Sequence, residues 1–419
     1  MGKYIIQGKN KLMGEVFLSG AKNAVLPILA ATVLNEGISI LKNVPMLLDT
    51  FVAIDILKDL GCDVTYGENT LIINSKNINK TEVNENLVKK MRSSIIFLGS
   101  ILARFKEASI GYPGGCNLGK RPIDFHLDSF KKMGIKIEET EKVIKASLDK
   151  IKETIIELPF RSVGATQNII LASIFGEEKV VIKNCAKEPE IIDMINFLIR
   201  MGANIKGAGT DTITIKGIDK INKNIEYTIM PDRIEAGTFL CMAAITKGEI
   251  KVNDINPEHL RALTDVLEKA NCIIQKSKNN IKIKATKDIK NIDFLETNPY
   301  PYFPTDLQPQ LISLLATAKG KSVIKENIFE ARNKHIKELN SLGCNILENE
   351  NMFVINGVDT LKGKRVFAKD LRGGAALICA GLFAEGETIV EGACYINRGY
   401  ENLDKKLNLL GANIKYVKN

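Results

Sequence analysis

The hydrophobic positions along the chain follow one arrangement that recurs six times. Each copy begins with a helix that is apolar on nearly all sides, as in NIILASIF and ALICAGLFA, and such a helix is buried. A short strand follows, then an amphipathic helix with Lys, Glu and Asp on one face, and in most copies a β-hairpin with alternating apolar residues. The predicted apolar helices span residues 22–34, 92–104, 163–175, 233–245, 306–318 and 372–384.

The C-terminal ends of the amphipathic helices carry the clearest sign of this repeat. Five of them have Gly and one has Asn where the helix turns into a strand. These positions are about 70 residues apart, at 61, 134, 202, 271, 343 and 411. Gly best tolerates the left-handed conformation just past a helix, and Asn is next best.

A repeat with one buried and one outer helix predicts an α/β fold of two inside-out α/β barrel domains. Each domain would hold three pseudo-symmetric βα repeats, with helices inside and sheets outside. The last copy lacks a closing hairpin, so we expect the N-terminal strands to complete its sheet. This predicts a discontinuous domain of residues 1–20 and 230–419 that holds both termini, and an inserted domain of residues 21–229.

Charged residues stand at the starts of the predicted buried helices, notably Lys22, Arg92, Arg233 and Arg372. A helix N-terminus already carries partial positive charge, so further cations there are unfavourable unless they serve an anionic ligand. The alternative for each one is a salt bridge to a neighbouring carboxylate. Asp306 also begins such a helix, where it is either a favourable first-turn residue or a candidate general base.

The segment from residue 113 to 122, PGGCNLGKRP, combines glycines, prolines, a cysteine and two cations. Glycines allow movement, and the cations beside Cys116 favour its thiolate. The segment is therefore a candidate lid that carries a reactive thiol. A plain turn with an incidental cysteine is the alternative.

Composition narrows the possible functions. The chain has 58 basic and 49 acidic residues, a net charge of +9, which suits an anionic substrate. Basic tracts with interleaved aromatics are missing, which argues against nucleic acid, and no apolar run reaches the ~20 residues of a membrane span. The eight cysteines lack metal-site spacing, so we expect no metal and mostly buried thiols. We expect His259 and His335 to face solvent, and a cytoplasmic location.

Ten segments of the chain resemble the bacterial enolpyruvyl transferases that act on a UDP-sugar. They are GAKNAVLPILAA, MRSSI, PGGCNLGKRPIDFH, SVGAT, EPEIID, MPDRIEAGT, FPTDLQ, FEAR, DLRGGAA and NRGYE. The resemblance implies two α/β domains that act on phosphoenolpyruvate and UDP-N-acetylglucosamine. The enolpyruvyl group would pass to the 3′-hydroxyl of the sugar with release of phosphate, the first committed step of peptidoglycan synthesis, without a cofactor.

The resemblance also implies residue roles. Cys116, Asp306, Lys22 and Arg398 would be catalytic: Cys116 as proton donor and as the site alkylated by fosfomycin, Asp306 as acceptor of the 3′-hydroxyl proton, and Lys22 and Arg398 on phosphoenolpyruvate. The implied substrate-binding residues are Asn23, Arg92, Arg121, Pro122, Ile123, Asp124, Phe125, His126, Ser162, Val163, Gly164, Ile328, Arg332, Asp370 and Arg372.

One position departs from the family pattern. Phe160 stands where the family often has Lys, and we expect the neighbouring Arg161 to take over that contact, or the Phe160 ring to stack instead. Three other functions stay open: the shikimate-phosphate enzyme of the same fold, a regulatory copy without catalysis, and an RNA-binding protein. Cys116 argues against the first, and the intact set of catalytic candidates argues against the second.

Overall fold

The computed structural model describes residues 2–114, 123–285 and 287–418, and its contacts divide the chain into two compact units. The terminal unit comprises the described residues of 1–19 and 231–419, so both ends of the chain belong to it. The inserted unit comprises the described residues of 20–230. Each unit has its own hydrophobic core.

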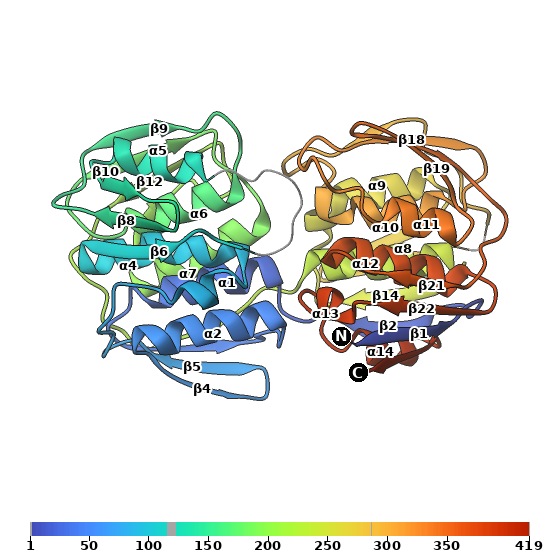
Figure 1. Cartoon of the computed structure of the whole chain (residues 1–419), viewed down its shortest axis with the longest axis horizontal. Helices are drawn as coiled ribbons and strands as arrows, with labels where there is room; N and C mark the ends of the chain where they lie inside the picture. Colours follow the sequence, from blue (N-terminus) through green and yellow to red (C-terminus); the bar gives the residue numbers. More distant parts are fainter. Residues whose placement is uncertain (1, 115–122, 286, 419) are drawn as a thin grey trace. The chain divides into compact units, whose positions relative to one another are not determined.

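In the terminal unit the core is built around three helices that are almost wholly buried, and Figure 1 shows them inside the unit with strands toward its outside. These helices, α8 (Arg233–Ile245), α10 (Gln308–Leu315) and α12 (Leu371–Phe383), contact one another. The amphipathic helices are α9 (Arg261–Lys269), α11 (Ile336–Ser341) and α14 (Leu403–Leu409). Shorter helices are α13 (Ala393–Ile396), η2 (Pro257–Leu260) and η3 (Thr305–Leu307).

Three four-stranded sheets surround these helices. Their strand orders are β21 (Arg365–Phe367), β22 (Glu387–Glu391), β1 (Lys3–Gln7), β23 (Asn413–Val417); then β15 (Ile273–Ser277), β16 (Asn280–Lys284), β14 (Glu249–Asn253), β2 (Met13–Phe17); and β17 (Leu295–Glu296), β18 (Lys321–Lys325), β20 (Met352–Asn356), β19 (Asn345–Asn349).

The inserted unit repeats this plan. Its buried helices are α1 (Lys22–Thr32), α4 (Ile96–Phe105) and α6 (Val163–Ala172), and α4 contacts both of the others. Its remaining helices are α2 (Leu48–Leu60), α5 (Asp124–Lys132), α7 (Pro189–Met201), α3 (Glu85–Val88) and η1 (Arg92–Ile95). Its sheets are β13 (Ile225–Thr228), β3 (Ile38–Lys42), β5 (Thr70–Asn74), β4 (Asp63–Gly67); β6 (Glu107–Gly111), β8 (Val143–Ser147), β7 (Lys136–Glu139); and β11 (Asn204–Lys206), β12 (Thr212–Lys216), β10 (Lys179–Lys183), β9 (Thr154–Glu157).

The six predicted helix ends are confirmed in geometric detail. All six residues have positive φ, between 70° at Asn271 and 112° at Gly202. After each of them, the next backbone N–H donates to a carbonyl five residues earlier, as from Cys62 to Leu57 at 2.9 Å and from Ala412 to Leu407 at 3.0 Å. This bond closes the helix and turns the chain into the following strand.

The predicted fold class is confirmed, with one correction at the N-terminus. Strand β1 lies between β22 and β23, as expected for a strand that completes the last sheet. Strand β2 does not join that sheet; it pairs in parallel with β14. The predicted buried helices also begin differently at two places, since short 3₁₀ turns, η1 and η3, precede α4 and α10.

Candidate active site

Asp306 lies between two buried arginines of the terminal unit. Its Oδ1 accepts from Nη1 of Arg332 at 2.8 Å, and its Oδ2 accepts from Nη2 of Arg372 at 3.1 Å. The arginines are 4% and 2% exposed, whereas the Asp306 side chain is 24% exposed. The carboxylate is therefore held by two charge-assisted bonds and still reaches solvent, which suits a group that must meet a substrate.

Glu326, a buried residue that the sequence analysis missed, fixes η3, the short turn that contains Asp306. Oε1 of Glu326 accepts from the Thr305 hydroxyl at 2.9 Å and from the backbone N–H groups of Ile328 at 2.9 Å and Phe329 at 3.1 Å. Arg332 also donates to the Thr305 carbonyl at 2.7 Å. A polar residue directly after the apolar strand KSVIK was the available signal.

Arg372 is positioned from two sides. Asp370 caps α12 by accepting from the backbone N–H groups of Arg372 and Gly373, at 3.1 and 2.9 Å. The Arg372 guanidinium lies 5.5 Å from the ring centre of Tyr400. Burial by itself would lower the pKa of Arg372, but Asp306, Tyr400 and Asp232 together outweigh burial and raise that pKa, so Arg372 stays charged.

Two other predicted cations begin helices of the inserted unit. Lys22 is the first residue of α1, and its Nζ lies 3.0 Å from Oδ2 of the buried Asp49, a partner that the sequence analysis did not name. Asn23 follows it in the same turn. Arg92 begins η1 and donates to the Pro113 carbonyl at 3.2 Å, at the start of the candidate lid.

His126 sits against the N-terminus of α6, where Ser162 caps the helix and accepts from the Ala165 N–H at 3.3 Å. A Cβ at Gly164 would lie 3.2 Å from Cε1 of His126, so the imidazole covers this glycine. Burial, and then the charge of Arg92, lower the pKa of His126 to about 4. The ring is neutral at pH 7.

The Asn168 side chain determines which nitrogen of His126 carries the proton. Its Nδ2 donates to the Ile95 carbonyl and lies within 3.0 Å of Nδ1 of His126, while its Oδ1 accepts from the Gly99 N–H. Because an amide nitrogen only donates, Nδ1 of His126 is the acceptor. The proton is thereby assigned to Nε2, which faces Gly164.

Arg161 is directed toward a surface carboxylate. Its Nη2 lies 2.6 Å from Oδ1 of Asp211, and its Nε donates to Oδ1 of Asn184 at 3.2 Å. Lys187 reaches the same Asp211 oxygen at 2.7 Å. Phe160 is exposed. The structure thus joins Arg161 with a second cation next to the capped end of α6.

The structure describes only some of the other predicted site residues. Cys116, Arg121 and Pro122 lie outside the described residues. Of the residues after them, Asp124 begins α5 and Phe125 packs against the inserted unit's core. Arg398 is half-buried in the segment between α13 and α14.

The prediction that His335 faces solvent was wrong. It is 2% exposed, because the chain passes beneath the start of α12, where a Cβ on Gly373 would lie 3.1 Å from the Cβ of His335. Burial lowers its pKa to about 4. Buried thiols were predicted correctly for Cys62, Cys185, Cys241, Cys272, Cys344 and Cys379.

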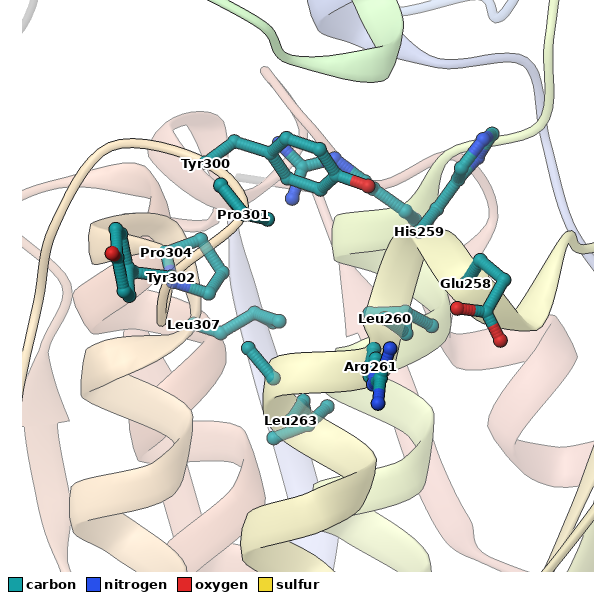
Figure 2. A pocket seen from close by; sticks show the side chains of 12 residues that line it. Glu258, His259, Leu260, Arg261, Leu263, Tyr300, Pro301, Tyr302, Pro304 and Leu307 are labelled. Atoms are coloured by element: carbon teal, nitrogen blue, oxygen red, sulfur yellow. The ribbon is translucent and has the colours of Figure 1, made fainter.

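A cavity of about 170 Å³ lies in the terminal unit next to η3, the turn that contains Asp306, and Figure 2 shows its lining. Tyr300 and His259 stand at its rim, and Leu260, Leu263 and Leu307 form an apolar wall. The Arg233 guanidinium lies 5.5 Å from the Tyr300 ring centre. His259, which we had expected to face solvent, is half-buried and belongs to the lining of this cavity.

The described residues contain no cluster of His, Cys, Asp or Glu that could hold a metal ion. None of the helices in the described part of the chain has the length and apolar content to cross a membrane. The terminal unit has a carboxylate held by two arginines. The inserted unit, taken by itself, has cations and a capped helix N-terminus. Such groups can bind anions and accept a proton from a hydroxyl.

Comparison with known proteins gives these groups a context. A family model described as EPSP synthase (3-phosphoshikimate 1-carboxyvinyltransferase) matches residues 6–407. UDP-N-acetylglucosamine 1-carboxyvinyltransferase 2 of Caldanaerobacter subterraneus subsp. tengcongensis is 48% identical over 99% of this chain and 99% of its own. The UDP-N-acetylglucosamine 1-carboxyvinyltransferase of Thermotoga maritima is 45% identical over 100% of this chain and 99% of its own.

Solved structures agree in fold. The enolpyruvyl transferase NikO from Streptomyces tendae has a TM-score of 0.89 at 22% identity, covering 99% of both chains. EPSP synthase from Acinetobacter baumannii has a TM-score of 0.77 at 18% identity, covering 100% of both chains. From the full-length agreement with its curated relatives, this chain belongs to the UDP-N-acetylglucosamine 1-carboxyvinyltransferases, within the larger EPSP synthase family.

Proposed function

We propose that this protein transfers the enolpyruvyl group of phosphoenolpyruvate to the 3′-hydroxyl of UDP-N-acetylglucosamine and releases phosphate. The observation that carries the proposal is the match to relatives of that name along the whole chain, at 48% identity for the Caldanaerobacter protein. The carboxylate of Asp306 supplies the base that the reaction needs. A nucleotide sugar and phosphoenolpyruvate are both intracellular metabolites, so the cytoplasm is the proposed location.

The reaction is an addition followed by an elimination. The 3′-oxygen forms a bond to C2 of phosphoenolpyruvate while its own proton leaves and C3 gains a proton. The C2–O bond to phosphate then breaks, C3 loses a proton, and the double bond returns. The protein must supply a base for the hydroxyl, an acid for C3, and positive charge for the phosphate and carboxylate.

In this scheme Asp306 accepts the 3′-hydroxyl proton. Arg332 and Arg372 each hold one of its oxygens, so the carboxylate is fixed in position before the substrate arrives. Cys116 donates the proton to C3. Lys22, Arg121 and Arg398 hold phosphoenolpyruvate, and Arg92 helps to close the site around it.

Several residues are proposed to hold the UDP-sugar. Asn23 would contact the sugar, and Ile328 would contribute the backbone segment that Glu326 fixes. Ser162, Val163 and Gly164 present the N-terminus of α6, which favours a phosphate group. Residues 121–126 would complete the nucleotide site, with neutral His126 covering Gly164.

A second candidate is transfer to shikimate 3-phosphate, favoured by the description of the matching family model. One assay separates the two: phosphate release from phosphoenolpyruvate with either acceptor. We expect release with UDP-N-acetylglucosamine alone. Release with shikimate 3-phosphate instead would move the protein to that activity, and release with neither would contradict both.

Fosfomycin tests the role of Cys116 within the same assay. We expect the drug to inactivate the enzyme covalently at this thiol. A Cys116→Asp variant should keep turnover, because an aspartic acid can still donate a proton, and should resist the drug. Inactivation of that variant by fosfomycin would show that the drug reacts elsewhere and would remove the support for a reactive lid.

A further inference from the structure

Ser19 lies at the centre of a buried polar cluster in the terminal unit. Its backbone N–H donates to Oε2 of Glu235 at 2.8 Å, and its hydroxyl donates to Oε2 of Glu401 at 2.9 Å. The same hydroxyl accepts from Nζ of Lys406 at 2.8 Å, and its carbonyl accepts from the Asp232 N–H at 2.9 Å. We call Ser19, Glu235, Glu401 and Lys406 the Ser19 cluster.

One buried ion pair anchors this cluster. Nζ of Lys406 lies 2.6 Å from Oε1 of Glu235, and the two side chains are 16% and 2% exposed. Burial raises the pKa of Glu235, and the charge of Lys406 opposes that rise. Without Lys406, the Glu235 carboxylate would lose its counter-ion in a buried place, so the pair constrains both side chains.

The cluster holds the two segments by which the chain leaves and re-enters the terminal unit. Ser19 is the last residue of the first segment, and Lys22 follows three residues later at the start of α1. Asp232 belongs to the second segment and caps α8 through bonds to the N–H groups of Ile234 and Glu235. Ser19 and Lys406 therefore act on the backbone that leads to Lys22.

The segment that carries Arg398 is fixed on both sides, and the Ser19 cluster supplies one of the contacts. On one side, Oδ1 of Asn397 accepts from the Tyr4 hydroxyl at 2.6 Å. On the other, the Tyr400 hydroxyl lies 2.8 Å from Oγ1 of Thr238, and Glu401 accepts from Ser19. A Cβ on Gly399 would lie 2.6 Å from Leu371, so the backbone has little room to move.

We propose that Lys406 is a positioning residue for phosphoenolpyruvate. Through Ser19 and Glu401 it sets the place of Arg398, and through Ser19 it sets the backbone that leads to Lys22. The inference rests on the proposed function, since Arg398 and Lys22 are the cations assigned there to phosphoenolpyruvate. Lys406 itself touches no substrate in this scheme.

The test compares Lys406→Met with Lys405→Met, a neighbouring exposed lysine on the same helix. We expect Lys406→Met to raise KM for phosphoenolpyruvate about tenfold or more, with KM for UDP-N-acetylglucosamine changed less than about twofold. Lys405→Met should match the wild type in both. Lys406→Arg should restore most of the loss, because it keeps the charge.

A merely structural role would give a different pattern. Loss of folded enzyme would lower the apparent kcat and leave both KM values unchanged, and that result would overturn the inference, as would equal behaviour of the two methionine variants. If Lys406→Met does not fold, Ser19→Ala keeps the Glu235–Lys406 pair and should raise KM for phosphoenolpyruvate alone. An unchanged value in that variant would also overturn the inference.

Failure of the proposed function would be visible in the wild type itself. A wild-type enzyme that does not turn over UDP-N-acetylglucosamine contradicts the function and says nothing against the cluster's geometry. A wild-type enzyme that turns it over while Lys406→Met behaves like Lys405→Met contradicts the role of Lys406 alone.

Discussion

The two units share one repeat and differ in how they balance the charges at the starts of their buried helices. In the terminal unit, one carboxylate, Asp306, serves two arginines that are almost fully buried. In the inserted unit, Lys22 has its own carboxylate in Asp49, and Arg92 donates to a backbone carbonyl. The repeat places a polar residue at the same point of each copy, and long-range partners then decide its chemistry.

This difference suggests a division of labour. A carboxylate between two cations is held in one orientation, as a base must be. A cation that donates to a neutral carbonyl, as Arg92 does, can exchange that partner for a ligand anion without leaving a buried charge unpaired. We therefore expect loss of the Asp306 carboxylate to affect the chemical step, and loss of the Asp49 carboxylate beside Lys22 to affect binding.

The largest effect should come from Asp306. Asp306→Ala removes the proposed base, and we expect turnover to fall by about 10²–10⁴ in a phosphate-release assay. It also leaves Arg332 and Arg372 without their shared carboxylate, so unfolding by urea should show a loss of about 3–5 kcal/mol.

The matched variant in the inserted unit is Asp49→Asn. It removes the carboxylate beside Lys22, and we expect kcat to stay within about tenfold while KM for phosphoenolpyruvate changes. An Asp306→Ala loss below tenfold would reduce Asp306 to a helix-start residue. A larger kcat loss in Asp49→Asn than in Asp306→Ala would reverse the division of labour.

The buried histidines provide a second comparison, through the pH dependence of stability. His126 and His335 each have a pKa of about 4 in the folded protein, below the ordinary value of 6.5, because both are buried. The unfolded chain therefore binds more protons as pH falls below 6.5, and the free energy of unfolding decreases. Each histidine should cost about 2 kcal/mol at pH 5 relative to pH 7.

Replacing each histidine by leucine in turn distinguishes the histidine of the inserted unit from that of the terminal unit. Nδ1 of His126 is bonded to Asn168, so His126→Leu should lose about 1–3 kcal/mol at pH 7. Among the described residues His335 has no hydrogen-bond partner on either ring nitrogen, so His335→Leu should keep or gain stability there. Between pH 7 and pH 5, both variants should lose less stability than the wild type does. Urea unfolding at the two pH values measures this, and a greater loss for His335→Leu at pH 7 would contradict the comparison.

The smallest effects are expected at two glycines that lie against these histidines. A Cβ on Gly164 would meet Cε1 of His126 at 3.2 Å, a contact that a small ring shift relieves. A Cβ on Gly373 would come within 2.8 Å of Oδ2 of Asp370, the carboxylate that caps α12.

Alanine gains about 1 kcal/mol over glycine inside a helix, so Gly164→Ala should be nearly neutral. Gly373→Ala should destabilise by about 1–2 kcal/mol, since the cap must move. Thermal unfolding without substrate compares the two variants. Equal melting temperatures would mean that the start of α12 is as adaptable as the start of α6.

Local pattern was sufficient for the fold, because its signals lie within single copies of the repeat. Gly61 and Asn271 mark helix ends through a conformation that few residues tolerate, and the all-apolar helices identify the core. The starts of those helices were equally visible, which is how Lys22, Arg92 and Asp306 became candidates.

The hydrogen-bond and ion-pair partners could not be predicted from the sequence, because they are far apart in the chain. No local pattern around Asp306 indicates its contact with Arg372, and none around Tyr400 indicates its contact with Thr238. Glu326 was missed and His335 was wrongly predicted to be exposed for the same reason: the burial of a polar residue cannot be recognised until its neighbours are known. Burial of such groups depends on packing between copies of the repeat, which a single sequence does not display.

The pairing of β1 between β22 and β23 has a consequence for synthesis on the ribosome. The inserted unit is continuous in sequence, so all of its strands and helices have been made by residue 230. Strand β1 is made before the inserted unit, whereas its neighbours β22 and β23 are made more than 150 residues after that unit is complete. The sheet of the terminal unit that contains β1 therefore closes only once β23 has been made, and until then β1 is an unpaired edge that needs protection from aggregation.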